Sequence, residues 1–221
     1  MADAEPFRGL DRREVVMGGA VLMAAGSGPA LAQQGAGIVR LRLMATTDIH
    51  VNIANYDYYR DVQDETVGLA KVATLIDAAR AGAPNTLLFD NGDFNQGNPL
   101  GDYVALEKGL KAGEVHPVIA AMNLIGYDAG TLGNHEFNYG LDFLDRCLAG
   151  ARFPFVSANA VSGVLGAAPR ADKTFLKPYL ILEREVVDEA GVRHRLKVGV
   201  IGVVPPQIVQ WDEAHLRGRI V

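Results

Sequence analysis

Gly133-Asn134-His135-Glu136 is the stretch of this 221-residue chain that says most about its fold. It directly follows the apolar segment 128–132, which predicts a short buried strand, and it precedes a helical pattern of apolar residues over 141–148. In a chain of this composition, the four-residue string is expected about once in a thousand sequences. It therefore marks a polar cluster between a strand and a helix.

The same alternation of strand and helix extends outward from this stretch. The predicted elements, in order, are strand 38–47, helix 66–81, strand 86–90, helix 115–124, strand 128–132, helix 141–148 and strand 153–158. This order favours an α/β fold in which helices cover a largely parallel sheet. Segments 179–188 and 194–204 flank a Gly-containing turn and predict an antiparallel hairpin. Segments 51–65, 91–113 and 159–177 have little pattern, and the first two follow the carboxyl ends of strands.

Polar residues stand where three of the predicted strands end. Asp48 and His50 follow the first strand, Asp93 the second and Asn134 the third. These residues fall on one edge of the sheet, which is where α/β proteins bind ligands. Separated by one residue in an extended segment, Asp48 and His50 point the same way and can share one cation. Asp93 could bridge two cations and Asn134 could bind the second, which leaves His135 free to act on a phosphate.

Each of these features alone has an ordinary structural explanation. An Asp-x-His triplet is expected by chance about 0.4 times in a chain of this composition, and a Gly-Asp pair is commoner still. Asp48 could cap a helix or turn, and Asp93 could be a turn residue. All three features at successive strand ends indicate a metal site instead.

The three blocks Asp48-x-His50, Gly92-Asp93 and Gly133-Asn134-His135-Glu136 resemble the first three sequence blocks of the calcineurin-like metallophosphoesterases. The resemblance implies a four-layer α/β-β/α fold, of which this chain would hold only the amino-terminal part. It also implies two divalent metal ions, for which manganese, zinc, cobalt, iron and magnesium are all possible.

The resemblance also implies a role for each residue of the three blocks. Asp48 and His50 would bind the first metal, and Asp93 would bridge both metals. Asn134 would bind the second metal, and His135 would be the catalytic residue at the phosphoryl group. Glu136 would orient its neighbours rather than bind metal.

Neighbouring segments favour one branch of this family. Pro-Leu-Gly-Asp-Tyr at 99–103 and Val-Val-Pro-Pro-Gln at 203–207 resemble the exported enzymes that hydrolyse 2′,3′-cyclic nucleotides and 3′-nucleotides. The resemblance implies opening of a cyclic diester to a 3′-monoester, and then release of phosphate and a nucleoside. The alternatives are a 5′-nucleotidase or sugar-diphosphate hydrolase, and a truncated remnant that binds metal or phosphate without catalysis.

The family's remaining metal ligands, a lone histidine and a Gly-His-x-His block, lie downstream of the Pro-Pro-Gln segment and are not found in this sequence. Its carboxyl-terminal nucleotide-binding domain is also absent. We therefore expect residues 33–221 to be the amino-terminal part of a metallophosphoesterase domain, either a fragment or a natural truncation. His116 is predicted to start a helix, His194 to lie on the hairpin surface and His215 to lie in a loop.

Residues 1–32 have the layout of an export signal. Arg12 and Arg13 precede the apolar run 15–25, and Ala-Leu-Ala at 30–32 offers a cleavage site after Ala32. The run is shorter than the ~20 residues needed to cross a bilayer. Paired arginines before a weakly apolar run are typical of a twin-arginine signal. We expect a periplasmic protein that engages the export machinery and does not associate stably with the membrane.

The net charge and the cysteine count narrow the function further. A formal charge of −5 argues against the basic surface of a general nucleic-acid-binding protein. The expected partners are therefore not polymeric nucleic acids, and the resemblance implies nucleotide substrates instead. The single cysteine, Cys147, cannot form an intramolecular disulfide and is expected to be buried as a small apolar residue.

Overall fold

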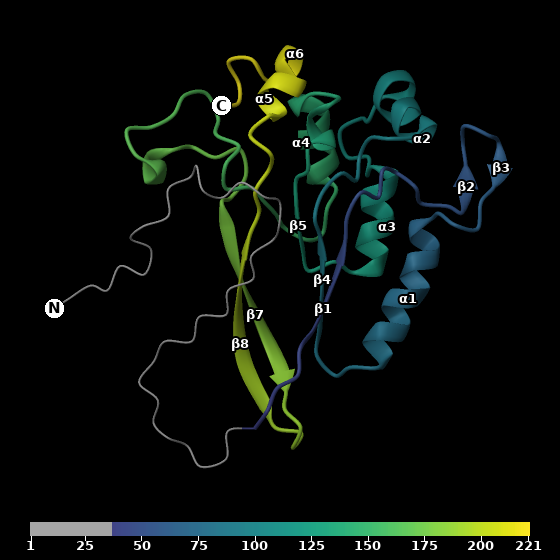
Figure 1. The fold of residues 1–221 in the computed structure, drawn as a ribbon, viewed down its shortest axis with the longest axis vertical. Helices are drawn as coiled ribbons and strands as arrows, with labels where there is room; N and C mark the ends of the chain where they lie inside the picture. Colours follow the sequence, from purple (N-terminus) through teal and green to yellow (C-terminus); the bar gives the residue numbers. More distant parts are fainter. Residues whose placement is uncertain (1–36) are drawn as a thin grey trace.

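The computed structural model describes residues 37–221, so the predicted export signal at 1–32 lies outside the described residues (Figure 1). Its centre is a parallel sheet with the strand order β1-β4-β5-β6. The strands are β1 (Arg42–Thr46), β4 (Thr86–Asp90), β5 (Ala129–Thr131) and β6 (Phe155–Val156). The predicted α/β class and the predicted parallel sheet are confirmed.

Three helices connect the strands of the sheet. They are α1 (Leu69–Ala81), α3 (Pro117–Ile125) and α4 (Leu141–Ala149). Pro117 begins α3, where its missing N–H costs no helical hydrogen bond, and Gly126 ends it in a left-handed conformation with φ 80°. All three helices were predicted, with ends that differ by a few residues. Strands β1, β5 and β6 are shorter than predicted because pairing stops where the neighbouring strand ends.

Alternate residues of β4 face two different layers. Leu88 packs in the same cluster as Leu69 and Ile76 of α1, whereas Leu87 packs against the antiparallel hairpin through Leu182 and its neighbours. The hairpin consists of β7 (Tyr179–Val187) and β8 (Arg193–Ile201), as predicted. Figure 1 shows it on the opposite side of the sheet from α1 and α3. The described residues thus form a helical layer, a parallel sheet and a hairpin layer.

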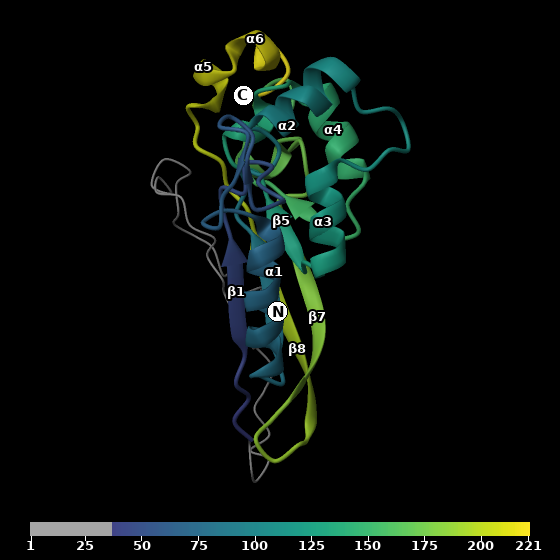
Figure 2. The ribbon, with the colours of Figure 1, turned by 90° about the vertical axis from the view of Figure 1, so that its right-hand side faces the viewer.

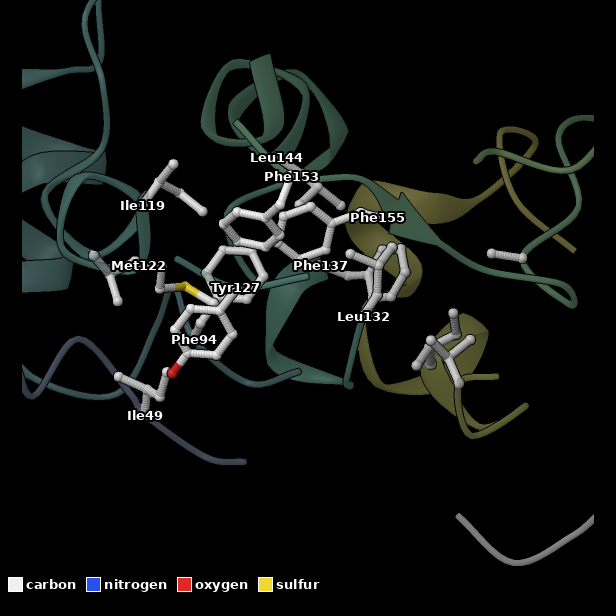
Figure 3. Packing of buried hydrophobic residues seen from close by; sticks show 14 of the residues in the cluster. Ile49, Phe94, Ile119, Met122, Tyr127, Leu132, Phe137, Leu144, Phe153 and Phe155 are labelled. Carbon is white, nitrogen blue, oxygen red and sulfur yellow. The ribbon is translucent and has the colours of Figure 1, made fainter. Parts of the chain in front are cut away.

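Aromatic side chains make up a large part of the main hydrophobic core (Figure 3). Tyr127 stacks on Phe153 with ring centroids 5.6 Å apart, and Phe153 contacts Phe155 at 5.0 Å. Phe94, which has no exposed surface, contacts Phe155 at 5.3 Å. Because Phe94 directly follows Asp93, the core anchors the loop that carries this predicted metal ligand.

The three segments with little sequence pattern contain short regular elements. These are β2 (Tyr56–Asp57), β3 (Val62–Gln63), α2 (Pro99–Asp102), a π-helical turn (Tyr103–Lys108) and a 3₁₀ turn (Pro169–Ala171). The start of α2 is set by Asn98, whose side chain accepts hydrogen bonds from the N–H groups of Leu100 and Gly101. These elements are too short for an apolar period to develop, which is why the sequence shows little pattern there.

The last described segment folds against the end of the molecule that carries α2 and α4. It contains α5 (Ile208–Trp211) and α6 (Glu213–Leu216), which lie at this end in both views (Figures 1 and 2). His215 belongs to α6, so its assignment to a loop was wrong. A Cβ atom on Gly140 would come within 3.2 Å of the His215 ring, which shows how closely the segments approach. None of the helices in residues 37–221 has the length and apolar character needed to cross a membrane.

Candidate metal centre

The segment after β1 turns sharply and carries the first two predicted metal ligands. Asp48, His50 and Val51 have left-handed backbones with φ 53°, 47° and 57°. The prediction of an extended segment here was therefore wrong. The backbone leaves the strand conformation because it follows the loop after β4: Asp48 N–H donates to Gly92 O at 3.0 Å, and Val51 N–H donates to Phe94 O at 3.0 Å. The strained conformation persists because these hydrogen bonds hold it.

The turn still brings Asp48 and His50 together, as the sequence predicted. His50 Nε2 lies 3.6 Å from Asp48 Oδ1. The other ring nitrogen, Nδ1, lies 2.6 Å from the backbone oxygen of Gln96. Since a carbonyl oxygen can only accept, Nδ1 donates and Nε2 keeps the lone pair that a metal requires. Gly97 permits this arrangement, because a Cβ atom there would lie 2.6 Å from His50 Nδ1.

Asp93 lies where the loops after β4 and β5 touch. Its φ of 60° follows Gly92, at which a Cβ atom would come within 2.1 Å of the backbone nitrogen of Gly133. The lack of a side chain at Gly92 therefore lets the two loops approach closely. Asp93 Oδ1 accepts a hydrogen bond of 2.7 Å from the N–H of His135, so the two loops are tied directly.

The side chain of Glu136 is hydrogen-bonded to both of these loops. Its carboxylate is fully buried and accepts hydrogen bonds from the N–H groups of Asp93 at 2.7 Å, Phe94 at 2.8 Å and Gly133 at 2.6 Å. Burial raises the pKa of Glu136 to about 7, against the lowering effect of these donors. The contacts are those of a group that orients its neighbours, in keeping with the role that the resemblance implied.

The ligand atoms converge on one small volume. His50, Asp93 and His135 each offer one such atom, and the three atoms lie within 4.8 Å of one another. The His50 and His135 rings meet edge to face with centroids 5.0 Å apart. Asp48, Asp93 and Asn134 all border a cavity of about 170 Å³. The structure thus brings together all five site residues predicted from the sequence, with His135 beside His50 and Asp93.

Side chains that sequence reasoning missed support the same site. Asp90 is buried at the end of β4 and accepts a hydrogen bond of 2.6 Å from Thr46, whose hydroxyl also contacts that of Tyr127 at 2.9 Å. Burial raises the pKa of Asp90 to about 7 and that of Tyr127 to about 12. Asp90 is the last residue of the predicted strand 86–90, so its position was visible from the sequence, whereas the contact between Thr46 and Tyr127 depends on the fold.

Asn138 is a further missed residue of the site. His135 Nδ1 lies 2.7 Å from Asn138 Oδ1, and the amide nitrogen of Asn138 donates to Asp212 at 2.9 Å. The spacing of three residues within a helical turn is a signal that could have revealed the first contact. The contact with Asp212 joins distant parts of the chain, and no local pattern points to it.

The residues present fit a divalent cation. They supply an imidazole nitrogen with a free lone pair and oxygens from two carboxylates and one amide, a mixed set that suits borderline and hard metals. The other described histidines lie elsewhere. His116 caps α3 as predicted, and His194, on the hairpin as predicted, lies 2.8 Å from Asp188. Cys147 is buried, as predicted, and burial raises the pKa of its thiol.

Comparison with known proteins places this geometry in a family. The sequence profile of the family described as calcineurin-like phosphoesterase matches residues 41–202, which is most of the chain. The chain belongs to the calcineurin-like phosphoesterases. The structure of the calcineurin-like phosphoesterase YfkN from Bacillus subtilis superimposes with a TM-score of 0.76 at 48% identity, and covers 82% of this chain and 53% of that one.

Named relatives of this phosphoesterase act on nucleotides. The 2′,3′-cyclic-nucleotide 2′-phosphodiesterase/3′-nucleotidase of Yersinia enterocolitica is 51% identical over 185 residues, which cover 84% of this chain and 27% of the relative. The 5′-nucleotidase of Rattus norvegicus is 34% identical over 165 residues, which cover 68% of this chain and 26% of the relative. The chain therefore spans about a quarter of the length of these two relatives.

Proposed function

We propose that the protein hydrolyses 2′,3′-cyclic nucleotides to 3′-nucleotides, and 3′-nucleotides to nucleoside and phosphate, with two divalent metal ions. The cavity bordered by Asp48, Asp93 and Asn134, with His50 and His135 beside it, is the observation that carries the proposal. The relative from Yersinia enterocolitica supports the choice of substrate through its name and its 51% identity.

The proposed roles follow the donor atoms. His50, through Nε2, and Asp48 would hold one metal ion. Asn134, through its side-chain oxygen, would hold the other, and Asp93 would be a ligand shared by both. Divalent cations held there would lower the pKa of water and neutralise the charge that develops on the phosphoryl oxygens. As hydroxide attacks phosphorus and the P–O bond to the leaving group breaks, the His135 imidazolium donates its Nε2 proton to the leaving oxygen. It then becomes the neutral tautomer whose Nδ1–H stays on Asn138.

A substrate panel tests this proposal directly. The protein expressed from its own gene and loaded with manganese or zinc should release phosphate from 3′-AMP and convert 2′,3′-cyclic AMP. Chelation should abolish both reactions, because the proposed chemistry depends on metal. A metal-loaded preparation that leaves both substrates untouched and cleaves 5′-AMP would instead support a 5′-nucleotidase, which the 34% identity to the rat enzyme keeps as the second candidate.

Two substitutions separate metal binding from chemistry. Asp93→Ala should lose metal and activity together, because it removes the ligand that both metals share. His135→Ala should retain metal and lower kcat by roughly a hundredfold or more. Metal content per chain by mass spectrometry, alongside kcat, measures both effects. The exposed Asp77 on α1 provides the matched control, since Asp77→Ala should change neither quantity. Equal metal loss in the Asp93 and His135 variants would contradict the assigned roles.

We also propose that residues 1–32 direct export to the periplasm by the twin-arginine route and are cleaved after Ala32. Replacement of Arg12 and Arg13 by lysine should leave the precursor in the cytoplasm. Cell fractionation and amino-terminal sequencing provide the measurement. Periplasmic protein from the double variant, with an unchanged cleavage site, would reject the twin-arginine route.

A further inference from the structure

The side chain of Asp212 does not cap the helix that it precedes. It stands at the amino-terminal cap of α6, where an aspartate ordinarily accepts hydrogen bonds from the first N–H groups of the helix, yet its side chain makes no such bond. The residue is only 7% exposed. Its Oδ1 accepts a hydrogen bond of 2.9 Å from Asn138 Nδ2, and its Oδ2 is buried with no hydrogen-bond partner among residues 37–221. The carboxylate is therefore turned away from its own helix and toward Asn138.

This contact fixes which way the Asn138 amide points. An ionised carboxylate can only accept, so Asn138 must present its NH₂ group to Asp212 and its oxygen to the other side. That oxygen lies 2.7 Å from His135 Nδ1. Because an amide oxygen can only accept, Nδ1 must carry a proton. A flipped amide would instead present NH₂ to Nδ1 and select the opposite tautomer.

We propose that Asp212 is a positioning residue for His135, which acts through Asn138 to keep the proton on Nδ1 and to direct Nε2 into the site. The inference deepens the proposed function, since it explains how His135 is prepared to act at the phosphoryl group. The three residues come from two segments that the fold joins at the end of the molecule carrying α4, α5 and α6 (Figure 2). The hydrogen bonds run from the Asp212 carboxylate through the Asn138 amide to the His135 imidazole.

The chain offers an isosteric test in two steps. In Asp212→Asn, residue 212 can donate or accept, so the Asn138 amide loses its obligatory direction and His135 should populate both tautomers. In the double variant Asn138→Asp/Asp212→Asn, the new carboxylate at 138 accepts from both neighbours, which restores the proton to Nδ1. Glu213→Gln on the same helix is the matched control, because Glu213 pairs with Arg217 on the surface.

Long-range ¹H–¹⁵N correlation spectra of histidine-labelled protein, at about pH 8 where histidine is ordinarily neutral, measure the tautomer. His135 is assigned by the signal missing in His135→Gln. We expect Nδ1–H in the wild type and the control, a change of at least about fivefold in the tautomer ratio in Asp212→Asn, and recovery in the double variant. An unchanged ratio in Asp212→Asn, or no recovery in the double variant, would overturn the proposal.

Kinetics add a second readout that bears on function. Asp212→Asn should lower kcat by roughly tenfold to a hundredfold with little change in KM, and the double variant should regain most of the loss. A wild-type protein that turns over none of the nucleotides would contradict the proposed function. The spectra would still test the positioning role, because they need no substrate.

Discussion

One buried carboxylate, that of Glu136, connects the loops that carry the candidate ligands. It accepts hydrogen bonds from backbone N–H groups on both loops and has no contact with solvent. These donors would otherwise be buried without partners, at a cost of about 1 to 3 kcal/mol each. The position of Asp93 relative to Gly133 therefore depends on Glu136.

Glu136→Gln should destabilise the protein by about 2 to 4 kcal/mol, because the new NH₂ group would face backbone donors instead of accepting from them. Urea unfolding at neutral pH measures the change in the free energy of unfolding. Glu107→Gln, on an exposed part of the π-helical turn, should change it by less than about 0.5 kcal/mol. A similar small effect at both positions would show that the carboxylate does not hold the loops.

At the scale of single elements, helix α3 begins at a histidine that burial keeps neutral. His116 has no exposed surface, its Nδ1 accepts a hydrogen bond of 3.3 Å from the N–H of Val118, and its ring meets that of Phe143 edge to face. Burial lowers the pKa of His116 from 6.5 to about 4. Among residues 37–221, no charged neighbour contributes to this shift.

This lowered pKa predicts a loss of stability in mild acid. Between about pH 6.5 and pH 4, the unfolded chain takes up a proton at His116 that the folded chain does not, so stability falls as pH falls. His116→Asn keeps a capping side chain and does not titrate. From pH 7 to pH 5, the wild type should lose about 2 kcal/mol more stability than the variant, measured by urea unfolding. Parallel pH profiles would contradict a neutral buried His116.

The elements also show what could be predicted from sequence. Helices α1, α3 and α4 were predicted because each carries several turns of apolar period and a Gly or Pro signal at an end. The residues of the site were predicted because they follow strands directly. The left-handed turn at Asp48 and His50 was missed, because hydrogen bonds to a loop more than forty residues away impose it. Asp212 was missed for the same reason, since its partner is 74 residues distant.

At the scale of the whole molecule, the hairpin covers the face of the sheet opposite the helices. Leu182 of β7 is 7% exposed and packs with Leu87 and Val198, whereas the adjacent Ile181 is 53% exposed. Arg184 adds an ion pair of 2.7 Å to Asp128, next to β5. The hairpin therefore packs against the parallel sheet through one of its two faces.

Because only one face of the hairpin is buried, shortening two neighbouring side chains of β7 should change the free energy of unfolding by different amounts. Leu182→Ala should lower the free energy of unfolding by about 3 kcal/mol, because it leaves a cavity between the layers. Ile181→Ala, on the same strand and with the opposite orientation, should cost less than about 1 kcal/mol. Thermal and urea unfolding of the two variants provide the comparison. Equal losses would mean that the outer face of the hairpin is also covered.

The order of strands in the sheet has a kinetic consequence. The candidate ligands stand on loops that follow β1, β4 and β5, and each parallel pairing needs a helical crossover before it forms. The hairpin β7–β8 is local in sequence and can close early, whereas the ligand atoms converge only after three separate units have docked. Metal would then bind after the rate-limiting step of folding and lengthen the lifetime of the native state without hastening its formation.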